Sequence, residues 1–317
     1  MSLSPKAEAV FGAAEALSDK GIADMRAKAL EVLGEDKSVI VGVNGSYARR
    51  EVTSGSDVDL FFLYTDENEQ KATELQNQYR EALTAAKYEM PALGGVFSKP
   101  LSALKMRERI GGLEDRNIDI TRRMLMLLEG EWIFNKKAFE EARCELLKQY
   151  IPPTLREEQI CLFLLNDIIR YWRTICVDFE FKTQKDGKAK EIRLIKLRFS
   201  RMLLFLAGVL AVGETYEKPV NEKIAVLTEL FALPPVERIQ SIAGDRSIAA
   251  LEMYAGFLDA LNDEATRTQL SQKLTDGDES RAFTELRQRA HDFRDALLEL
   301  LKSHFSDGNP TIAALML

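Results

Sequence analysis

The sequence contains very few of the residues that bind transition metals or form disulfides. Only His291 and His304 are histidines, and neither has the spacing to a cysteine or a second histidine that a metal site needs. The three cysteines, Cys144, Cys161 and Cys176, are odd in number and widely spaced among apolar residues of predicted helices. This pattern favours reduced, buried thiols over disulfides. The sequence therefore offers no basis for a zinc centre or a Ser-His-Asp triad.

Long apolar stretches are also missing. The most hydrophobic run, residues 202–212, is too short for a helix that crosses a bilayer, which takes about 20 residues. The start of the sequence has neither the basic lead nor the long apolar run of a signal peptide. These two absences predict a cytoplasmic protein that does not associate with a membrane.

A surplus of basic residues is absent as well, because the formal net charge is −7. An acidic chain is not a general nucleic-acid coat protein, so any contact with nucleic acid should be local. The content of 46% hydrophobic and 29% charged residues is ordinary for an ordered, soluble protein. A chain of 317 residues is long enough for two cores, since single domains usually contain about 100–200 residues.

One stretch, residues 40–64, combines a strand, a tight turn and two spaced carboxylates. It opens with an apolar run typical of a short strand, and Gly45 then permits a sharp turn and a close backbone approach. Ser46 stands where a helix could begin, so its hydroxyl and the first free backbone amides would form a small anion-binding site suited to phosphate. Arg49 adds positive charge one turn further on.

The same stretch continues through a polar loop into Asp57-Val58-Asp59-Leu60 and further aromatic residues that favour a strand. Side chains two residues apart in a strand share a face, so Asp57 and Asp59 should project together. Two adjacent carboxylates are costly to keep ionised unless a cation binds them. Mg²⁺ suits such a pair, because it takes one or two protein carboxylates and completes its shell with water and substrate phosphates. The pattern predicts phosphoryl or nucleotidyl transfer.

Gly45, Ser46, Asp57 and Asp59 together resemble the signature of the DNA polymerase β-like nucleotidyltransferase superfamily, a Gly-Ser turn followed about ten residues later by an Asp-x-Asp strand. The longer pattern GSYARRE before SDVDLFF is more similar to the bacterial branch that includes the uridylyltransferase of the nitrogen-signalling PII protein. In that branch the catalytic domain is followed by a helical one. The resemblance covers about the first half of the chain.

The resemblance implies a role for each residue of the motif. Asp57 and Asp59 would be catalytic and would bind Mg²⁺, while Gly45, Ser46 and Arg49 would contact the phosphates of an incoming nucleoside triphosphate. An acceptor hydroxyl would then attack the α-phosphate, and pyrophosphate would leave.

The third carboxylate that the superfamily usually has on a neighbouring strand is not evident. The next segment that reads as a strand, residues 93–99, contains no acidic residue. The nearest candidates are Glu89, Asp115 and Asp119. The relatives that modify PII resemble this chain in having few carboxylates at the same point, so the gap does not by itself imply loss of activity.

The sequence after the motif divides into a strand-bearing half and a helical half. Helices are predicted at 5–33, with a break near Lys20-Gly21, and at 66–87 and 136–150, and an edge strand is predicted at 132–134. Pro152-Pro153 then separates a nucleotidyltransferase domain, 1–151, from a helical bundle, 152–317. We expect an α/β domain with a small mixed sheet and flanking helices, followed by an all-α bundle, with the active site in the cleft between them.

The helical half contains a run of basic residues that could bind the nucleotide. They are Arg170, Arg173, Lys182, Arg193, Lys196, Arg198 and Arg201. Arg173 and Lys196 are taken as candidates to face the triphosphate. The alternative is that these residues form solvated helix faces, where Arg and Lys usually lie. Helical geometry puts Arg198 on a different face from Lys196. Trp172 is expected in the core, whereas Tyr171 could be in the core or stack on a base.

The sequence leaves the acceptor and the oligomeric state open. The first hypothesis is a Mg²⁺-dependent enzyme that transfers a nucleoside monophosphate from a nucleoside triphosphate to a hydroxyl of a protein or nucleotide. A second is a template-independent oligonucleotide or signal-nucleotide synthase. A third, supported by the missing carboxylate, is a catalytically silent module that binds a nucleotide or a protein partner, in a regulatory or toxin-antitoxin role.

Overall fold

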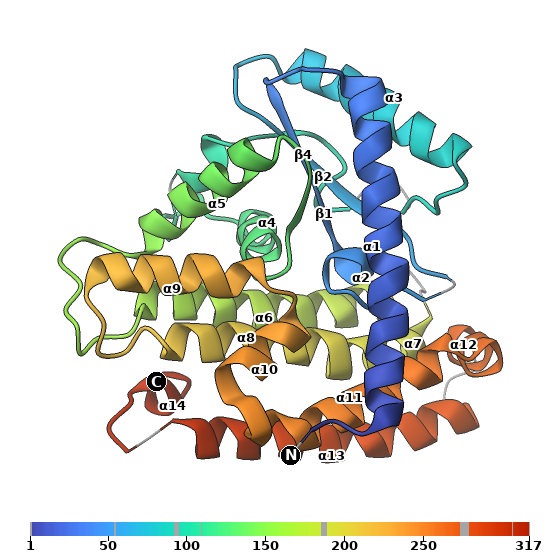
Figure 1. The fold of residues 1–317 in the computed structure, drawn as a ribbon, viewed down its shortest axis with the longest axis vertical. Coiled ribbons are helices and arrows are strands. Elements are labelled where there is room, and N and C mark those ends of the chain that lie inside the picture. Colours follow the sequence, from blue (N-terminus) through green and yellow to red (C-terminus); the bar gives the residue numbers. More distant parts are fainter. Residues whose placement is uncertain are drawn as a thin grey trace. The chain divides into compact units, whose positions relative to one another are not determined.

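The computed structural model of the chain describes residues 2–53, 55–91, 95–108, 110–184, 189–272, 279–305 and 307–316 (Figure 1). Its contacts divide the chain into two units. The helical unit comprises Met1–Gly12, Arg156–Pro219 and Pro235–Leu317, and the sheet unit comprises Ala13–Leu155 and Val220–Pro234. The predicted fold class is confirmed, because a small mixed sheet with helices is followed by a mostly helical part. The predicted division at residue 151 stays a prediction.

The sheet unit has a mixed sheet of four strands in the order β3-β2-β1-β4. Strand β1 pairs antiparallel with β2 and with β4, while β2 and β3 run parallel. The long helix α1 (Pro5–Leu33) begins in the helical unit and continues into this one. The other elements are β1 (Val39–Asn44), α2 (Gly45–Ala48), β2 (Asp59–Tyr64), α3 (Glu69–Ala85), β3 (Leu101–Ser102), the 3₁₀ turn η1 (Lys105–Arg107), α4 (Asn117–Leu128), β4 (Glu131–Phe134), α5 (Lys136–Tyr150) and α9 (Val220–Ala232).

Helices α1 and α3 cover one face of the sheet. Every second residue of the two central strands points to this face and joins one hydrophobic core with both helices. The Tyr79 hydroxyl of α3 donates a hydrogen bond of 2.7 Å to the Met25 carbonyl of α1, which ties the two helices together. On the opposite face, Phe61 of β2 packs against Phe97 and against Phe139 of α5, with ring centroids 5.1 and 6.1 Å apart. Both faces of β2 are therefore buried.

Helix α1 is continuous, so the break predicted at Lys20-Gly21 is wrong. A Cβ atom at Gly21 would lie 2.5 Å from the Tyr47 ring, which shows why glycine occupies this position. The residue allows α1 to approach the turn that follows β1 and does not interrupt the helix.

The prediction of a strand at 93–99 is also wrong for residues 95–99, which the structure describes. Residues 92–94 lie outside the described part, and residues 95–99 form turns and bends. The strand in this region is β3, which has only two residues and pairs with the end of β2 through Leu63 and Tyr64. The edge strand predicted at 132–134 is confirmed as β4, and the helix predicted at 136–150 is confirmed as α5.

The helical unit is built around α8, whose residues are almost all buried. Helices α6 and α10 pack on α8, and α13 packs on α11. Apolar residues that recur in steps of three and four from Phe283 to Leu300 are buried along one face of α13. The elements of this unit are α6 (Leu162–Gln184), α7 (Lys190–Lys196), the π-helical turn η2 (Leu197–Arg201), α8 (Met202–Gly213), α10 (Pro235–Ala243), η3 (Gly244–Ser247), α11 (Ile248–Asn262), α12 (Glu264–Ser271), α13 (Arg281–His304) and α14 (Thr311–Ala314).

Of the two aromatic residues of α6, Tyr171 lies in the core, which is one of the two places considered for it, whereas Trp172 is less buried than predicted. Tyr171 is 1% exposed, whereas Trp172 is half-buried and stacks on Phe205 with ring centroids 5.4 Å apart. The three cysteines are free thiols, and only Cys161 is buried. In the part of the chain that the structure describes, no helix combines the length and the apolar character needed to cross a membrane.

Asp36 makes the stability of the sheet unit depend on pH in the acid range. Its carboxylate accepts hydrogen bonds from Lys71 Nζ and Ser38 Oγ, each at 2.5 Å. These bonds hold the pKa of Asp36 at about 2, below its usual 3.8, and the bond from Lys71 makes the largest contribution. Because the folded-state pKa is depressed, the stabilisation is complete above the unfolded pKa and is lost as the pH falls toward 2.

We therefore expect Asp36→Asn to lower the free energy of unfolding by up to about 1 kcal/mol at pH 7 and by much less at pH 2, where the carboxylate is partly protonated in the folded state. Urea denaturation of both proteins at pH 7, 4 and 2 measures this difference. A difference of equal size at pH 7 and pH 2 would contradict the assignment, because an uncharged contact does not titrate.

Candidate active site at the end of strand β1

The turn after β1 places Gly45 directly against Asp59. Asn44, the last residue of β1, is paired with Asp59, the first residue of β2, in the antiparallel register. Gly45 has a φ of +72°, and a Cβ atom at this position would lie 2.4 Å from Asp59 Oδ2. The carboxylate thus occupies the space that any side chain at residue 45 would need. Only glycine satisfies both the backbone conformation and the close approach.

Asp57 and Asp59 alternate with buried residues. Asp57 is exposed and Asp59 is half-buried, whereas Val58 and Leu60 are 0% and 4% exposed and belong to the core beneath α1 and α3. Strand β2 begins at Asp59, and Asp57 lies in the segment without regular secondary structure before it. The alternation is the one expected for two carboxylates on the face that does not contribute to this core.

Both carboxylates lie close to the short helix α2. Asp59 contacts Gly45 at the start of α2. Tyr47, two residues on, is 8% exposed, and burial raises the pKa of its phenol, with a further contribution from the negative charge of Asp57. The Ser46 side chain between them is half-buried, and its hydroxyl has no hydrogen bond to any described residue. This hydroxyl is available to a ligand at the turn.

A buried network that the sequence did not reveal holds the turn in place. Glu129, at the end of α4, accepts a hydrogen bond of 3.1 Å from the Gly45 amide and forms a 2.6 Å ion pair with Arg49. Arg49 also pairs with Glu51 at 2.9 Å. The exposed fractions of the three side chains are 0% for Glu129, 8% for Arg49 and 3% for Glu51. Charge-assisted bonds of this kind are strong when they are desolvated.

Two parts of the sequence prediction are affected by this network. The Gly45 amide, expected to face phosphate, already has Glu129 as its partner. Arg49, expected to contact phosphate, is engaged with two carboxylates and has a structural part in the turn. Its contact with a nucleotide stays a prediction.

None of the three residues considered for a third carboxylate joins Asp57 and Asp59. Asp115 forms a buried ion pair with Arg123, and Asp119 pairs with Arg116 and Arg122. Among the residues that the structure describes, no group of three or more His, Cys, Asp or Glu side chains could hold a metal. Two carboxylates are therefore the donor set that the described site offers.

Glu89 comes nearer to the pair than the other two candidates, but through its backbone. Its carbonyl accepts a hydrogen bond of 2.8 Å from the Val58 amide, and its side chain is exposed. The segment after α3 therefore runs beside the residues that precede β2.

Asn44, the last residue of β1, is another buried polar residue beside the Gly45 turn. Its side chain is 2% exposed, and neither its Oδ1 nor its Nδ2 atom has a hydrogen-bond partner among the described residues. Buried amides are rarely left unpaired, because each unsatisfied group costs about 1–3 kcal/mol. Such residues are common at functional sites, where strain or unpaired groups are tolerated.

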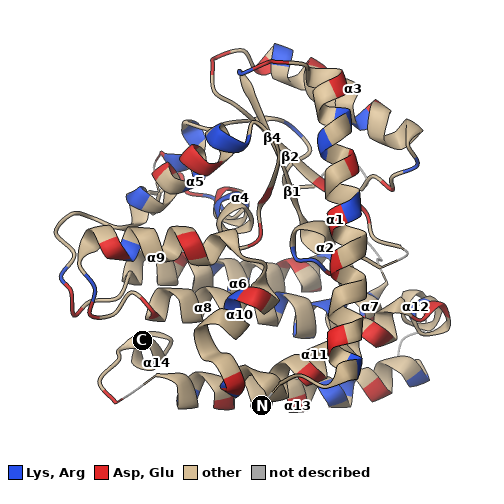
Figure 2. Ribbon diagram, in the orientation of Figure 1, with Lys and Arg blue, Asp and Glu red and all other residues tan. Residues whose placement is uncertain are grey.

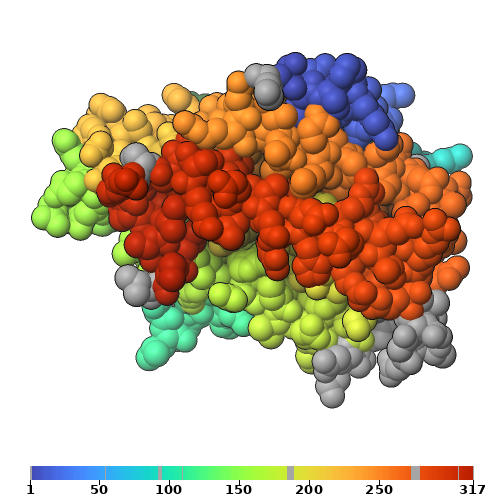
Figure 3. All heavy atoms as spheres, turned by 90° about the horizontal axis from the view of Figure 1, so that it is seen from below, coloured from blue at the N-terminus to red at the C-terminus, as the bar shows by residue number. Residues whose placement is uncertain are grey.

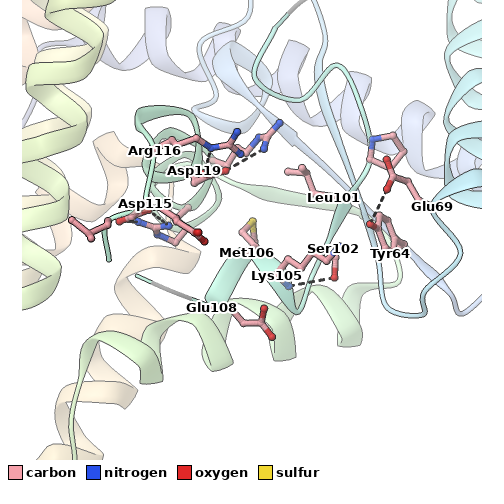
Figure 4. Close-up of a pocket in the computed structure, with 15 residues that line it drawn as sticks. Tyr64, Glu69, Leu101, Ser102, Lys105, Met106, Glu108, Asp115, Arg116 and Asp119 are labelled. Atoms are coloured by element: carbon pink, nitrogen blue, oxygen red, sulfur yellow. Dashed lines mark hydrogen bonds and ion pairs between the residues drawn. The ribbon is translucent and has the colours of Figure 1, made fainter. Parts of the chain in front are cut away.

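A cavity of about 810 Å³ in the sheet unit lies at the other end of β2. Tyr64, Lys105 and Asp119 are among its lining residues, and neither aspartate of the motif is among the described residues that line it. Tyr64 is five positions from Asp59, or about 17 Å along a strand. Figure 4 shows the Asp119 and Arg116 side chains paired in this cavity, and the Tyr64 hydroxyl directed to Glu69.

Arg122 and Arg123 are more buried than arginines usually are. Arg123 is 1% exposed, pairs with both oxygens of Asp115 at 2.9 Å and donates to the Tyr150 hydroxyl at 2.8 Å. Arg122 is half-buried and donates to the Val96 carbonyl at 2.8 Å.

Arg173 and Lys196, the two nucleotide-binding candidates of the helical unit, are both exposed. Arg173 lies on α6 and Lys196 is the last residue of α7. Their contact with a nucleotide stays a prediction.

We expect Gly45→Ala to destabilise the sheet unit by about 1–3 kcal/mol, because a Cβ atom at this φ is strained and collides with the Asp59 carboxylate. Chemical denaturation measures the loss. Gly12→Ala is a matched control, since Gly12 lies in α1 with nothing within 4 Å of the added atom. It should raise stability by about 0.5–1 kcal/mol. Equal effects of the two substitutions would contradict the geometry of the turn.

Comparison with protein families identifies a nucleotidyltransferase domain in residues 26–110. This segment begins within α1 and contains β1, α2, β2, α3 and β3, together with all four residues of the motif. Glu129 lies outside it. No sequence among the curated proteins matches the chain. The family match supports the resemblance to the nucleotidyltransferase superfamily, while the closer resemblance to the branch that modifies PII stays a prediction.

Proposed function

We propose that this protein is a Mg²⁺-dependent nucleotidyltransferase, which transfers a nucleoside monophosphate from a nucleoside triphosphate to an acceptor hydroxyl. The observation that carries the proposal is the packing of Asp59 against the Gly45 turn, with Asp57 two positions earlier, inside a segment that matches a nucleotidyltransferase domain. A surface Asp-x-Asp pair would have no need of a glycine whose missing side chain makes room for one carboxylate.

The donor set fits a hard divalent cation. Asp57 and Asp59 are the residues that would hold it, and Mg²⁺ commonly takes only one or two protein carboxylates, with water and phosphate oxygens as its other ligands. When bound, such a cation supplies charge neutralisation for the triphosphate and for the charge that develops during transfer. A third acidic ligand is not required for this role.

The residues of the chain would then position the nucleotide. The unpartnered hydroxyl of Ser46 can donate to a phosphate oxygen. Glu129 and Arg49 hold the turn in one conformation. Binding therefore does not lose the entropy of ordering the backbone that carries Ser46. The acceptor hydroxyl attacks the α-phosphorus, the bond from that phosphorus to the bridging oxygen of the β-phosphate breaks, and pyrophosphate leaves.

A catalytically silent module that binds a nucleotide or a protein is the second candidate. The observation that favours it is the lack, among the described residues, of a third acidic side chain beside Asp57 and Asp59. This candidate predicts binding of a nucleoside triphosphate without turnover.

The two candidates differ in whether pyrophosphate forms. The protein is incubated with each of the four nucleoside triphosphates, labelled at the α-phosphate, together with Mg²⁺ and with or without a cell extract as a source of acceptors. Pyrophosphate release with label on a protein indicates a protein-modifying enzyme, as in the branch that acts on PII. Label in oligonucleotides or small nucleotides indicates a template-independent synthase. If a nucleotide binds and no label moves under any of these conditions, the proposal fails.

A further inference from the structure

A second group of charged residues lies in the helical unit, where three arginines converge. The ring of Phe199, in the π-helical turn η2, stacks on that of Phe293 in α13, with centroids 5.0 Å apart. Arg198 and Arg294 are the immediate neighbours of these two rings in the sequence. The stacked pair therefore brings η2 and α13 into contact beside these two arginines. A π-helical turn is rare and is frequently found at functional sites.

Arg287 extends this group along α13. It precedes Arg294 by seven residues, which is two helical turns or about 10.5 Å on the same side of the helix. Its guanidinium lies over the Phe283 ring, 5.4 Å from the centroid, and pairs with Glu279. Arg294 pairs with its neighbour Asp295 at 2.8 Å. Both pairs are exposed, so they contribute little to stability and a ligand can replace them.

Among the residues that the structure describes, Arg198 has no such partner. The residue is half-buried, and its Nη1 atom is buried without a hydrogen bond to any of them. Burial lowers the pKa of the guanidinium, and the positive charges of Arg287 and Arg294 lower it further. A desolvated cation that faces two like charges is unfavourable unless an anion compensates it. Figure 2 shows acidic and basic residues interspersed along α13, which Figure 3 shows in orange to red.

We propose that Arg198, Arg287 and Arg294 form a binding site for a small multivalent oxyanion of the phosphate class. The guanidinium fork matches the oxygens of phosphate, and three forks suit a ligand with two or more negative charges. The side chain of Arg198 supplies the desolvated centre, while Arg287 and Arg294 supply accessible donors at its side. A single-charge ligand such as chloride would leave most of these donors unpaired.

Isothermal titration with inorganic pyrophosphate tests this site. The full chain is titrated at low ionic strength with EDTA, so that no metal-dependent binding at Asp57 and Asp59 contributes. We expect saturable binding to the wild type, weakened about tenfold or more by Arg198→Ala and by Arg294→Ala. The control is Arg281→Ala, which removes an arginine of the same helix that is 89% exposed and pairs with Glu285. It should change the affinity less than about twofold.

Two results would overturn the proposal. The first is the absence of saturable binding to the wild type, and the second is binding that Arg198→Ala leaves unchanged or that Arg281→Ala weakens equally. Thermal unfolding without anions separates a ligand site from a structural arginine. Arg198→Met should keep or raise the melting temperature, because it removes the repulsion. A clear fall in the melting temperature of Arg198→Met would show that Arg198 is needed for folding and would contradict the site.

Discussion

Replacing both Asp57 and Asp59 by asparagine is expected to reduce nucleotidyl transfer by about 10³-fold or more, measured as kcat/KM for pyrophosphate release. Metal coordination supplies several kcal/mol of transition-state stabilisation, and each 1.36 kcal/mol corresponds to a factor of ten in rate. Asparagine keeps the size of each side chain, so the Gly45 turn should still pack against residue 59. The loss should appear mainly in kcat, because it affects the charge that develops during transfer.

Glu67→Gln is the control for this experiment. Glu67 is exposed and follows the opposite end of β2, so its substitution removes one negative charge from the same unit without touching the turn. It should leave kcat/KM within about twofold. Circular dichroism and thermal unfolding should show that the double variant is folded. An active double variant, with turnover near that of the wild type, would rule out a catalytic role for the pair.

Glu129→Ala is expected to lower the free energy of unfolding by about 3 kcal/mol or more. It would leave the buried Arg49 with fewer partners and the Gly45 amide without its acceptor. Removal of one member of a buried ion pair typically costs about 3–5 kcal/mol, because the other charge stays desolvated. Activity should also fall by about 10–100-fold, as it does when residues that orient metal ligands are changed. Denaturant titrations and kinetic measurements on the same samples give both values.

Glu129→Gln separates the charge of this residue from its shape. It should cost less stability than alanine, since the amide oxygen can still accept from the Gly45 amide. Glu140→Ala is the control, which measures the loss of stability when an exposed carboxylate is removed. Glu140 lies on α5, is 51% exposed and is 3.8 Å from Lys136, so its loss should cost less than about 0.5 kcal/mol. If Glu129→Ala and Glu140→Ala had the same small effect, the network around Arg49 would not hold the turn.

The motif could be predicted from the sequence because its determinants are local. A glycine that breaks an apolar strand, and two aspartates that alternate with Val58 and Leu60, are features of one short segment. The structure confirms the strand, the turn and the alternation in burial around Asp59. Helices α5 and α13 were predictable for the same reason, since their apolar periodicity is contained within each helix.

The features that the sequence missed depend on distant partners. Glu129 is 84 residues from Gly45, and nothing near either residue indicates that they meet. Arg123 looked like a surface residue because arginine usually is one, yet Asp115 and Tyr150 provide partners that allow its burial. Tyr171 and Trp172 are adjacent on α6, so the packing of neighbouring helices decides which of the two is buried.

The strand predicted at 93–99 failed for a related reason. Val96 and Phe97 have the composition of a strand, but the turn that contains them places Phe97 on Phe61 and gives the Val96 carbonyl to Arg122. Packing across the sheet overrides the local β-propensity there. The pairing position beside β2 is taken by Leu101 and Ser102.

Binding of Mn²⁺ to the protein, followed by electron paramagnetic resonance with and without a non-hydrolysable nucleoside triphosphate, tests the central claim most directly. The signal of free Mn²⁺ reports binding whatever the acceptor may be. We predict one Mn²⁺ site in the wild type that tightens in the presence of the nucleotide, and a loss of that site in the Asp57→Asn/Asp59→Asn variant. Equal Mn²⁺ binding by the two proteins, in the presence of the nucleotide, would contradict the assignment of these aspartates as the metal site.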